Sequence, residues 1–225
     1  MILRPTLAIA GKDLHLVALR GAGLVQALLL GLLLLFLFSL TTDPGQWINP
    51  QAAAAIFWLA SIFCQVLIFN SLYGIEEPNA ARLTLLLAPI PHHAVWLGKT
   101  MAGAILMVAV QIVLLPAMLI LLGQRLKGPA FFGLGVIALI DLGLVTMGSF
   151  MGALAQGQAA RESMFSVILF PILIPLLLAG VRLGAATLGA PTNGLEAWVG
   201  LAAAFDALSC GVGLLLFSFV YNSED

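Results

Sequence analysis

Two carboxylate side chains in the middle of apolar runs are the residues best placed for chemistry. Asp141 lies ten residues after Phe131, and Asp206 lies eleven residues after Leu195. In helices, both acids would lie roughly 15 Å deep, near the middle of a bilayer. A charge there is costly, so such an acid is typical of a functional site that faces other helices or a wet cavity. The alternative is a hydrogen-bonded acid that fixes helix packing. No Lys or Arg lies at similar depth, which leaves a role in subunit contact open.

The histidines and cysteines give weaker signals. His92 and His93 follow a Pro-x-Pro stretch, and as neighbours on an irregular segment they would point in different directions. This favours two interfacial histidines over the alternative, a metal or haem ligand pair. Cys64 and Cys210 lie in apolar runs without CxxC spacing, which predicts buried small side chains. The sequence has no HExxH, GxSxG or GxxxxGK[ST] motif, so we expect no catalytic residues, no metal site and no ATP hydrolysis by this chain.

Composition places the chain among integral membrane proteins. Its 225 residues are 62% hydrophobic and 8% charged, with a mean hydropathy of +1.12. This leaves too little polar surface to cover a soluble globule, and it predicts an all-α membrane protein. The net charge is −1 and the nine Lys and Arg are scattered, which argues against a nucleic-acid partner. We expect residues 1–225 to form a single transmembrane domain.

The hydrophobic runs predict six transmembrane helices after an interfacial helix. Within residues 1–20, one stripe is apolar (Leu3, Leu7, Ala10, Leu14, Val17) and another flank carries Arg4, Lys12 and His15. That pattern is typical of a helix lying in the membrane interface. The expected spans, each with roughly 20 apolar residues, are 21–40, 52–73, 95–123, 131–155, 164–183 and 195–220.

Within these spans, special residues predict local features. Pro171 and Pro175 should kink or break the fifth span, because each removes a backbone hydrogen bond. The pairs Gly148/Gly152 and Gly180/Gly184 would allow close helix approach, within the subunit or with a second copy. The four tryptophans fall mostly at span ends, as in an aromatic belt: Trp47, Trp58, Trp96 and Trp198.

The sizeable polar interruption between the second and third spans is Ile75–Lys99, IEEPNAARLTLLLAPIPHHAVWLGK. Glu76 and Glu77 favour the positive end of a helix dipole, Pro78 suits a first helical turn, and Pro89 cannot continue the helix. A short amphipathic helix at the membrane surface is therefore predicted. We expect it to receive force from a soluble partner, through Asn79, Arg82, Leu83, Leu86, Leu87, Pro89 and Pro91.

The distribution of Lys and Arg predicts the orientation. With six spans, both termini share one side. That side would hold six basic residues (Arg4, Lys12, Arg20, Arg82, Lys99, Arg161), and the other side three (Arg125, Lys127, Arg182). The excess favours cytoplasmic N- and C-termini. The polar segment would then face the cytoplasm.

This layout resembles the permease subunit of a type-two ABC exporter, in which the loop after the second span is the coupling helix. Two stretches are more specifically similar to the CcmB family of cytochrome c maturation haem exporters. These are LTLLLAPIPHHAVWLGK (Leu83–Lys99) and SVILFPILIPLLLAG (Ser166–Gly180). Residues 79–83, NAARL, depart from the Asp-Gly-x-Leu-Glu-like segment usual in the family.

The resemblance implies a complex in the bacterial inner membrane. It would contain two copies of this chain, two copies of an ATPase (CcmA), a haem-handling membrane subunit (CcmC) and a small accessory subunit (CcmD). ATP would bind the ATPase, and haem would be handled by the complex, with no cofactor on this chain. The function implied is haem export or the release of haem-loaded chaperone. One alternative is a type-two exporter for a lipid, drug or polymer. Another is an ion-driven secondary transporter, which would show inverted repeats.

Overall fold

The computed structural model describes residues 3–20, 22–41, 48–74, 91–155 and 161–222. These ranges form seven α-helices and no strands, and six of the helices are long and apolar enough to cross a membrane. The predicted all-α membrane fold is confirmed. The helices are α1 (Leu3–Arg20), α2 (Ala22–Leu40), α3 (Pro50–Gly74), α5 (His92–Leu121), α6 (Ala130–Leu154), α7 (Arg161–Thr187) and α8 (Leu195–Asn222).

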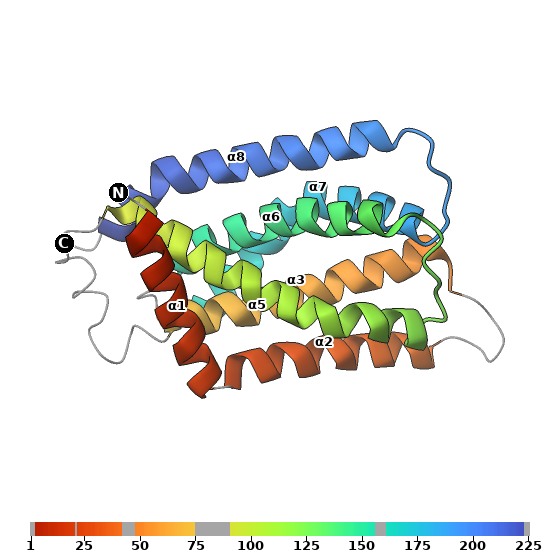
Figure 1. Cartoon of the computed structure of the whole chain (residues 1–225), viewed down its shortest axis with the longest axis horizontal. Coiled ribbons are helices and arrows are strands. Elements are labelled where there is room, and N and C mark those ends of the chain that lie inside the picture. Colours follow the sequence, from red (N-terminus) through yellow and green to blue (C-terminus); the bar gives the residue numbers. More distant parts are fainter. Residues whose placement is uncertain (1–2, 21, 42–47, 75–90, 156–160, 223–225) are drawn as a thin grey trace.

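Six long helices run side by side along the molecule, and α1 crosses one end of them at an angle (Figure 1). The last turn of α3, the first turn of α5 and the last turn of α8 lie at the same end as α1. The connections from α5 to α6 and from α7 to α8 lie at the opposite end. α3 is the central helix: it packs against α2, α5, α6 and α7, and its apolar window is 67% buried, compared with 17% for α2.

One local prediction about helix continuity is wrong, and a second is excluded in part. His92 and His93 belong to the first turn of α5, since the helix begins directly after Pro91 instead of further along the chain. α7 runs without interruption through Pro171 and Pro175, so the fifth span is not broken, whereas a kink at these prolines stays a prediction. Prolines are tolerated in membrane helices when packing with neighbouring helices compensates for the lost backbone hydrogen bonds. α7 packs against three such neighbours, α3, α6 and α8.

Both glycine pairs bring helices close together within the subunit. A Cβ added at Gly148 would collide with Gln65 and Phe69, and one at Gly152 would collide with Tyr73. Gly180 and Gly184 lie close against Trp58, where a Cβ would approach the indole ring to 3.2 and 3.0 Å. All of these partners belong to α3. The missing Cβ atoms therefore let α6 and α7 approach the central helix, as small residues do in membrane proteins.

Trp58 and Trp96 do not form an aromatic belt. They are only 1% and 2% exposed, and the Trp58 indole donates a 2.8 Å hydrogen bond to the Gly180 carbonyl. Buried indoles normally need such a partner. The large rings fill space opposite glycines: Gly180 and Gly184 for Trp58, and Gly213 for Trp96. The belt prediction is therefore wrong for these two residues.

The face of α1 that packs against the bundle overlaps only in part with the apolar stripe that was expected to lie in the membrane interface. Leu3 and Leu7 are 76% and 56% exposed. The buried stripe is Thr6, Ile9, Ala10, Asp13 and Val17, and Gly98 of α5 lies against Thr6 and Ile9. α1 therefore turns a partly polar stripe toward the bundle and leaves leucines on its outer side, where they could enter a membrane interface.

Candidate functional site

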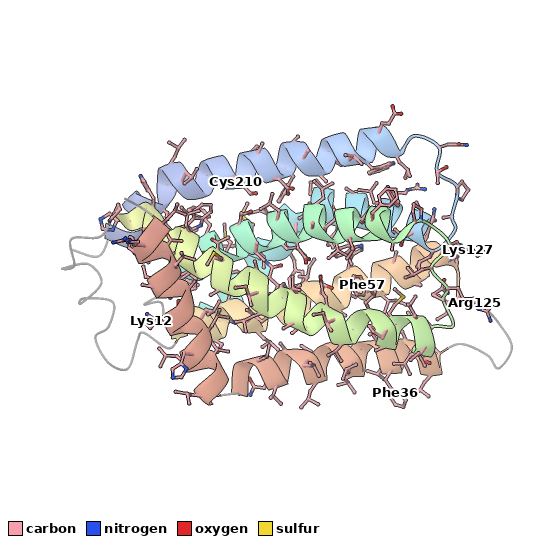
Figure 2. All side chains as sticks on the ribbon, viewed as in Figure 1. Lys12, Phe36, Phe57, Arg125, Lys127 and Cys210 are labelled. Atoms are coloured by element: carbon pink, nitrogen blue, oxygen red, sulfur yellow. The ribbon has the colours of Figure 1, made fainter. Side chains whose placement is uncertain are left out.

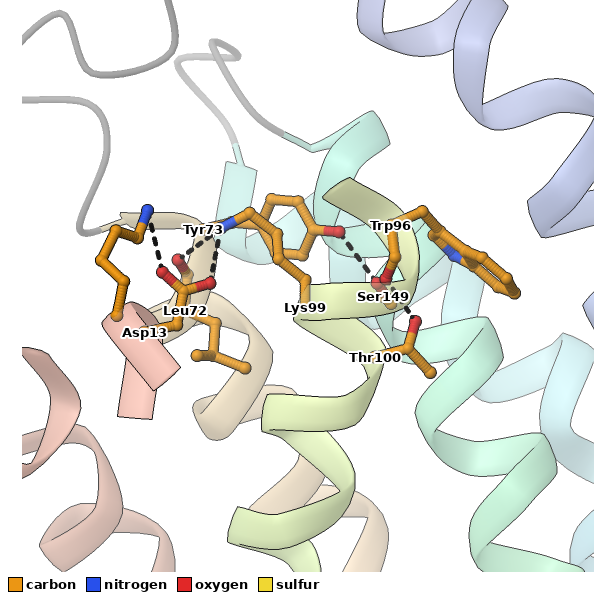
Figure 3. A network of polar contacts seen from close by, with 8 residues as sticks. Asp13, Leu72, Tyr73, Trp96, Lys99, Thr100 and Ser149 are labelled. Atoms are coloured by element: carbon orange, nitrogen blue, oxygen red, sulfur yellow. Dashed lines mark hydrogen bonds and ion pairs between the residues drawn. The ribbon is translucent and has the colours of Figure 1, made fainter. Parts of the chain in front are cut away.

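A buried lysine, Lys99, joins three helices near the ends of α3 and α5 that flank residues 75–90. Lys99 Nζ lies 3.4 Å from Asp13 Oδ2 of α1 and 3.2 Å from the Leu72 carbonyl of α3 (Figure 3). It also lies 4.6 Å from the centre of the Tyr73 ring. The side chains of Lys99 and Asp13 are completely buried. The ammonium group thus has a carboxylate, a carbonyl and an aromatic face as partners.

The contacts of this lysine extend to α6 and to the surface. The Tyr73 hydroxyl lies 2.9 Å from Ser149 Oγ of α6. On the other side, Lys12 Nζ lies 3.0 Å from Asp13 Oδ1, and the Lys12 side chain is 39% exposed. Lys12, Asp13, Lys99, Tyr73 and Ser149, with the Leu72 carbonyl, form what we call the Lys99 network. It connects α1, α3, α5 and α6.

The Lys99 network holds together the two helices that flank residues 75–90. Leu72 lies in the last turn of α3, where the final four carbonyls have no intrahelical donor. Lys99 supplies a donor there, and its charge is favourable at the negative end of the α3 dipole. Lys99 itself lies in the second turn of α5. A displacement of α5 must therefore move α1 or break a buried ion pair, and a displacement of the α3 end must break the hydrogen bond from Lys99 to the Leu72 carbonyl.

Most of the predicted coupling residues lie outside the described residues: Asn79, Arg82, Leu83, Leu86, Leu87 and Pro89. Pro91 is described. It is exposed, has an extended backbone (φ −64°, ψ 133°) and directly precedes α5. His92 is half-buried and His93 is exposed, both in the following turn. The structure therefore describes the two ends to which the polar segment is attached, Gly74 and Pro91.

Asp141 is part of the contact between α5 and α6. Its Oδ1 accepts a 2.7 Å hydrogen bond from Gln111 Nε2, and both residues are buried. Within the part of the chain that the structure describes, Asp141 Oδ2 and Gln111 Oε1 have no hydrogen-bond partner. The geometry fits the packing interpretation of Asp141, since one good hydrogen bond links neighbouring helices in mid-span.

Asp206 lies on another face of α6 and has poorer contacts. It is 4% exposed, and neither of its carboxylate oxygens has a hydrogen-bond partner among the described residues. Its side chain lies directly against Gly143 of α6. Asp206 belongs to α8 and touches α6 at Gly143, whereas Asp141 belongs to α6 itself. Asp141 is two positions from Gly143, about 200° around the helix, so the two acids lie on opposite sides of α6. They do not form a carboxylate pair.

Smaller polar contacts also link the spans. Gln65 of α3 donates to the Leu144 carbonyl, and Thr146 Oγ1 of α6 lies 2.9 Å from Ser209 Oγ of α8. Such bonds stabilise helix association by about 0.6 kcal/mol on average in a membrane. They hold the bundle together but supply no reactive group.

Sequence reasoning missed Asp13 and the pairing of Lys99. Asp13 shares a helical stripe with Thr6, Ile9, Ala10 and Val17, and a carboxylate in such a stripe indicates a buried partner. Lys99 lies only seven residues inside the third span, a second signal of the same kind. Two opposite charges that both lie on apolar faces could have been matched on this ground.

The comparison with known proteins agrees with this architecture. The sequence model of the family described as CcmB protein matches residues 4–221. The chain is also 27% identical over 177 residues to "Heme exporter protein B" of Rhodobacter capsulatus, covering 78% of this chain and 80% of that protein. The family match takes in all seven described helices except the first residue of α1 and the last residue of α8. We conclude that the chain belongs to the CcmB family.

Proposed function

We propose that this chain is the permease subunit of an ABC exporter that handles haem during cytochrome c maturation. Membership of the CcmB family and the likeness to a protein named "Heme exporter protein B" support this function. The chain would carry no catalytic residues. ATP would be hydrolysed by a separate CcmA-like subunit, in a complex with a second copy of this chain, a CcmC-like subunit and a CcmD-like subunit in the bacterial inner membrane.

Residues 75–90 would receive force from the ATPase on the cytoplasmic side. The observation that carries this proposal is the position of Lys99, whose ammonium group binds both Asp13 and the Leu72 carbonyl. Residues 75–90 connect α3 to α5, and Lys99 joins the adjacent ends of these two helices to each other and to α1. When ATP closes the two ATPase subunits, the ends of α1, α3 and α5 would move as one body. The opposite ends of α3 and α5 would tilt in response.

The basic residues support an orientation in which the α1 end of the bundle faces the cytoplasm. Arg4, Lys12 and Lys99 lie at the end of the bundle that includes α1, while Arg125, Lys127 and Arg182 lie at the opposite end (Figure 1). Arg20, Arg82 and Arg161 add to the first group by sequence. An excess of Lys and Arg favours the cytoplasm for the α1 end.

Leu86→Asp tests the assignment of the polar segment. The variant should remain in the membrane but lose complex-dependent ATP turnover, because a charged side chain would disrupt an apolar contact with the ATPase. Thr192→Asp is the control, since Thr192 is exposed between α7 and α8, at the opposite end. Normal assembly and turnover in Leu86→Asp would exclude the coupling role of the segment.

A further inference from the structure

A cavity of about 210 Å³ opens at the end of the bundle opposite α1. It lies between α3, α5, α6 and α7, and its inner walls are the buried side chains of Phe57, Trp58, Met118 and Val136. Its outer edge includes Leu126 and Leu134, which are 50% and 66% exposed. The cavity is therefore apolar inside and open toward the surface that the bundle presents to lipid.

Two basic residues lie beside this cavity. A second cavity of about 370 Å³ shares Leu188 with the first and is lined by Arg125 and Lys127. Figure 2 shows both basic residues at the same end of the molecule. Neither makes an ion pair with any of the described residues. Their charges are thus available to an anion at the level of the α5–α6 connection.

The loop that carries these charges is held in place. The backbone N–H groups of Lys127 and Gly128 both donate to the Thr187 carbonyl at the end of α7, at 3.0 and 3.4 Å. The Lys127 stem lies against Gly189, whose φ of 99° favours glycine and where a Cβ would collide with Lys127 Cδ. Lys127 therefore projects from a fixed backbone along a defined path.

We propose that this place binds an anionic phospholipid, with one acyl chain in the apolar cavity and the phosphate at Arg125 and Lys127. An apolar cavity of about 150 Å³ suffices for benzene, whereas drug-sized ligands occupy about 300–1,000 Å³. A volume of about 210 Å³ suits part of one hydrocarbon chain but not a macrocycle. Each Lys or Arg near a membrane surface favours anionic lipid on the order of fivefold. The proposal is independent of the proposed transport function.

Quenching of Trp58 by brominated lipid tests this proposal directly, because its ring forms part of the cavity wall. The full-length chain is reconstituted in phosphatidylcholine vesicles that contain either phosphatidylglycerol or phosphatidylcholine with brominated acyl chains. Brominated phosphatidylglycerol should quench at a mole fraction roughly 25-fold lower than brominated phosphatidylcholine, since each of the two cations contributes about fivefold. The Trp58→Phe variant should lose this difference, which identifies Trp58 as the ring that is quenched.

Two further variants separate the headgroup from the chain. Arg125→Gln together with Lys127→Gln should abolish the preference for phosphatidylglycerol, since both side chains are exposed and the loop backbone stays unchanged. Gly133→Leu should fill the cavity, because Gly133 lines it and a Cβ there meets no atom closer than 4.0 Å. Gly135→Leu is the matched control on the same helix, where a Cβ has no atom within 4 Å and the residue does not line the cavity.

Each outcome decides one part of the proposal. Equal quenching by the two brominated lipids in the unmodified chain would overturn selection by charge. A preference that persists in Gly133→Leu would overturn occupation of the cavity. Loss of the preference in Gly133→Leu but not in Gly135→Leu would support it. If Gly133→Leu fails to fold, the Arg125/Lys127 double variant still tests the headgroup contact.

Discussion

Removing Lys99 should destabilise the protein, and removing its partner Asp13 as well should largely restore stability. In Lys99→Met, the Asp13 carboxylate stays buried, and Lys12, on the side facing solvent, is the one cation left beside it among the described residues. At 3.4 Å and an effective dielectric constant of about 20, the lost attraction to Lys99 is roughly 5 kcal/mol. Leaving one member of a buried ion pair alone costs about 3–5 kcal/mol.

The double variant Lys99→Met/Asp13→Leu removes both charges and fills the same space with apolar atoms. Replacement of a buried ion pair in this way is often neutral or stabilising. At about 2–4 °C per kcal/mol for a chain of this length, the single variant should melt on the order of 10 °C lower, and the double variant close to the original. Thermal unfolding of the purified chains in detergent measures both shifts.

The double variant also separates stability from coupling. It should fold and assemble with its partners but show reduced ATP turnover, because α1, α3 and α5 are no longer held by one ammonium group. An unchanged melting temperature in Lys99→Met would refute the argument that the ion pair stabilises this end of the bundle. Full ATP turnover in the double variant would instead refute its part in force transfer.

Three further substitutions test the packing of the spans by thermal unfolding. Asp141→Asn should change the free energy of unfolding by less than about 1 kcal/mol, because an amide oxygen can accept the hydrogen bond from Gln111. Asp141→Leu removes the acceptor and should cost about 1–3 kcal/mol. Equal effects of the two variants would argue against this hydrogen bond. Gly152→Val should cost about 1–3 kcal/mol by collision with Tyr73, and a neutral result would contradict the close approach of α3 and α6. Asp206→Ala should keep or raise the melting temperature, because both Asp206 carboxylate oxygens lack hydrogen-bond partners among the described residues, and a marked fall would reveal a stabilising role.

Much of the fold could be predicted because hydrophobic length is a strong signal in membrane proteins. Each of the predicted spans corresponds to one of the long helices, with boundaries that differ by at most about four residues. The continuity of α7 could not be predicted, since the effect of Pro171 and Pro175 depends on tertiary packing. The burial of Trp58 could not be predicted for the same reason, because its hydrogen-bond partner Gly180 lies 122 residues away in the sequence.

The candidate site was less accessible to sequence reasoning. The deep acids attracted attention because each one is isolated in an apolar run, yet Asp141 has an ordinary packing contact with Gln111. Lys99 was counted only as one of the basic residues that set the orientation, and Asp13 was not singled out at all. Their pairing depends on how α1 crosses the bundle, and the sequence period alone does not fix that geometry. The two residues are also 86 positions apart in the sequence, so local sequence patterns give no sign of their contact.

The proposal that residues 75–90 receive force from the ATPase is tested most directly by a photo-crosslinker placed at Leu86, in membranes that also contain the ATPase subunit. We predict a covalent adduct between this chain and the ATPase, formed more strongly at position 86 than at position 126 on the opposite end. If position 86 gives no adduct with the ATPase, or if the adduct forms at position 126 instead, the segment between α3 and α5 does not receive the force.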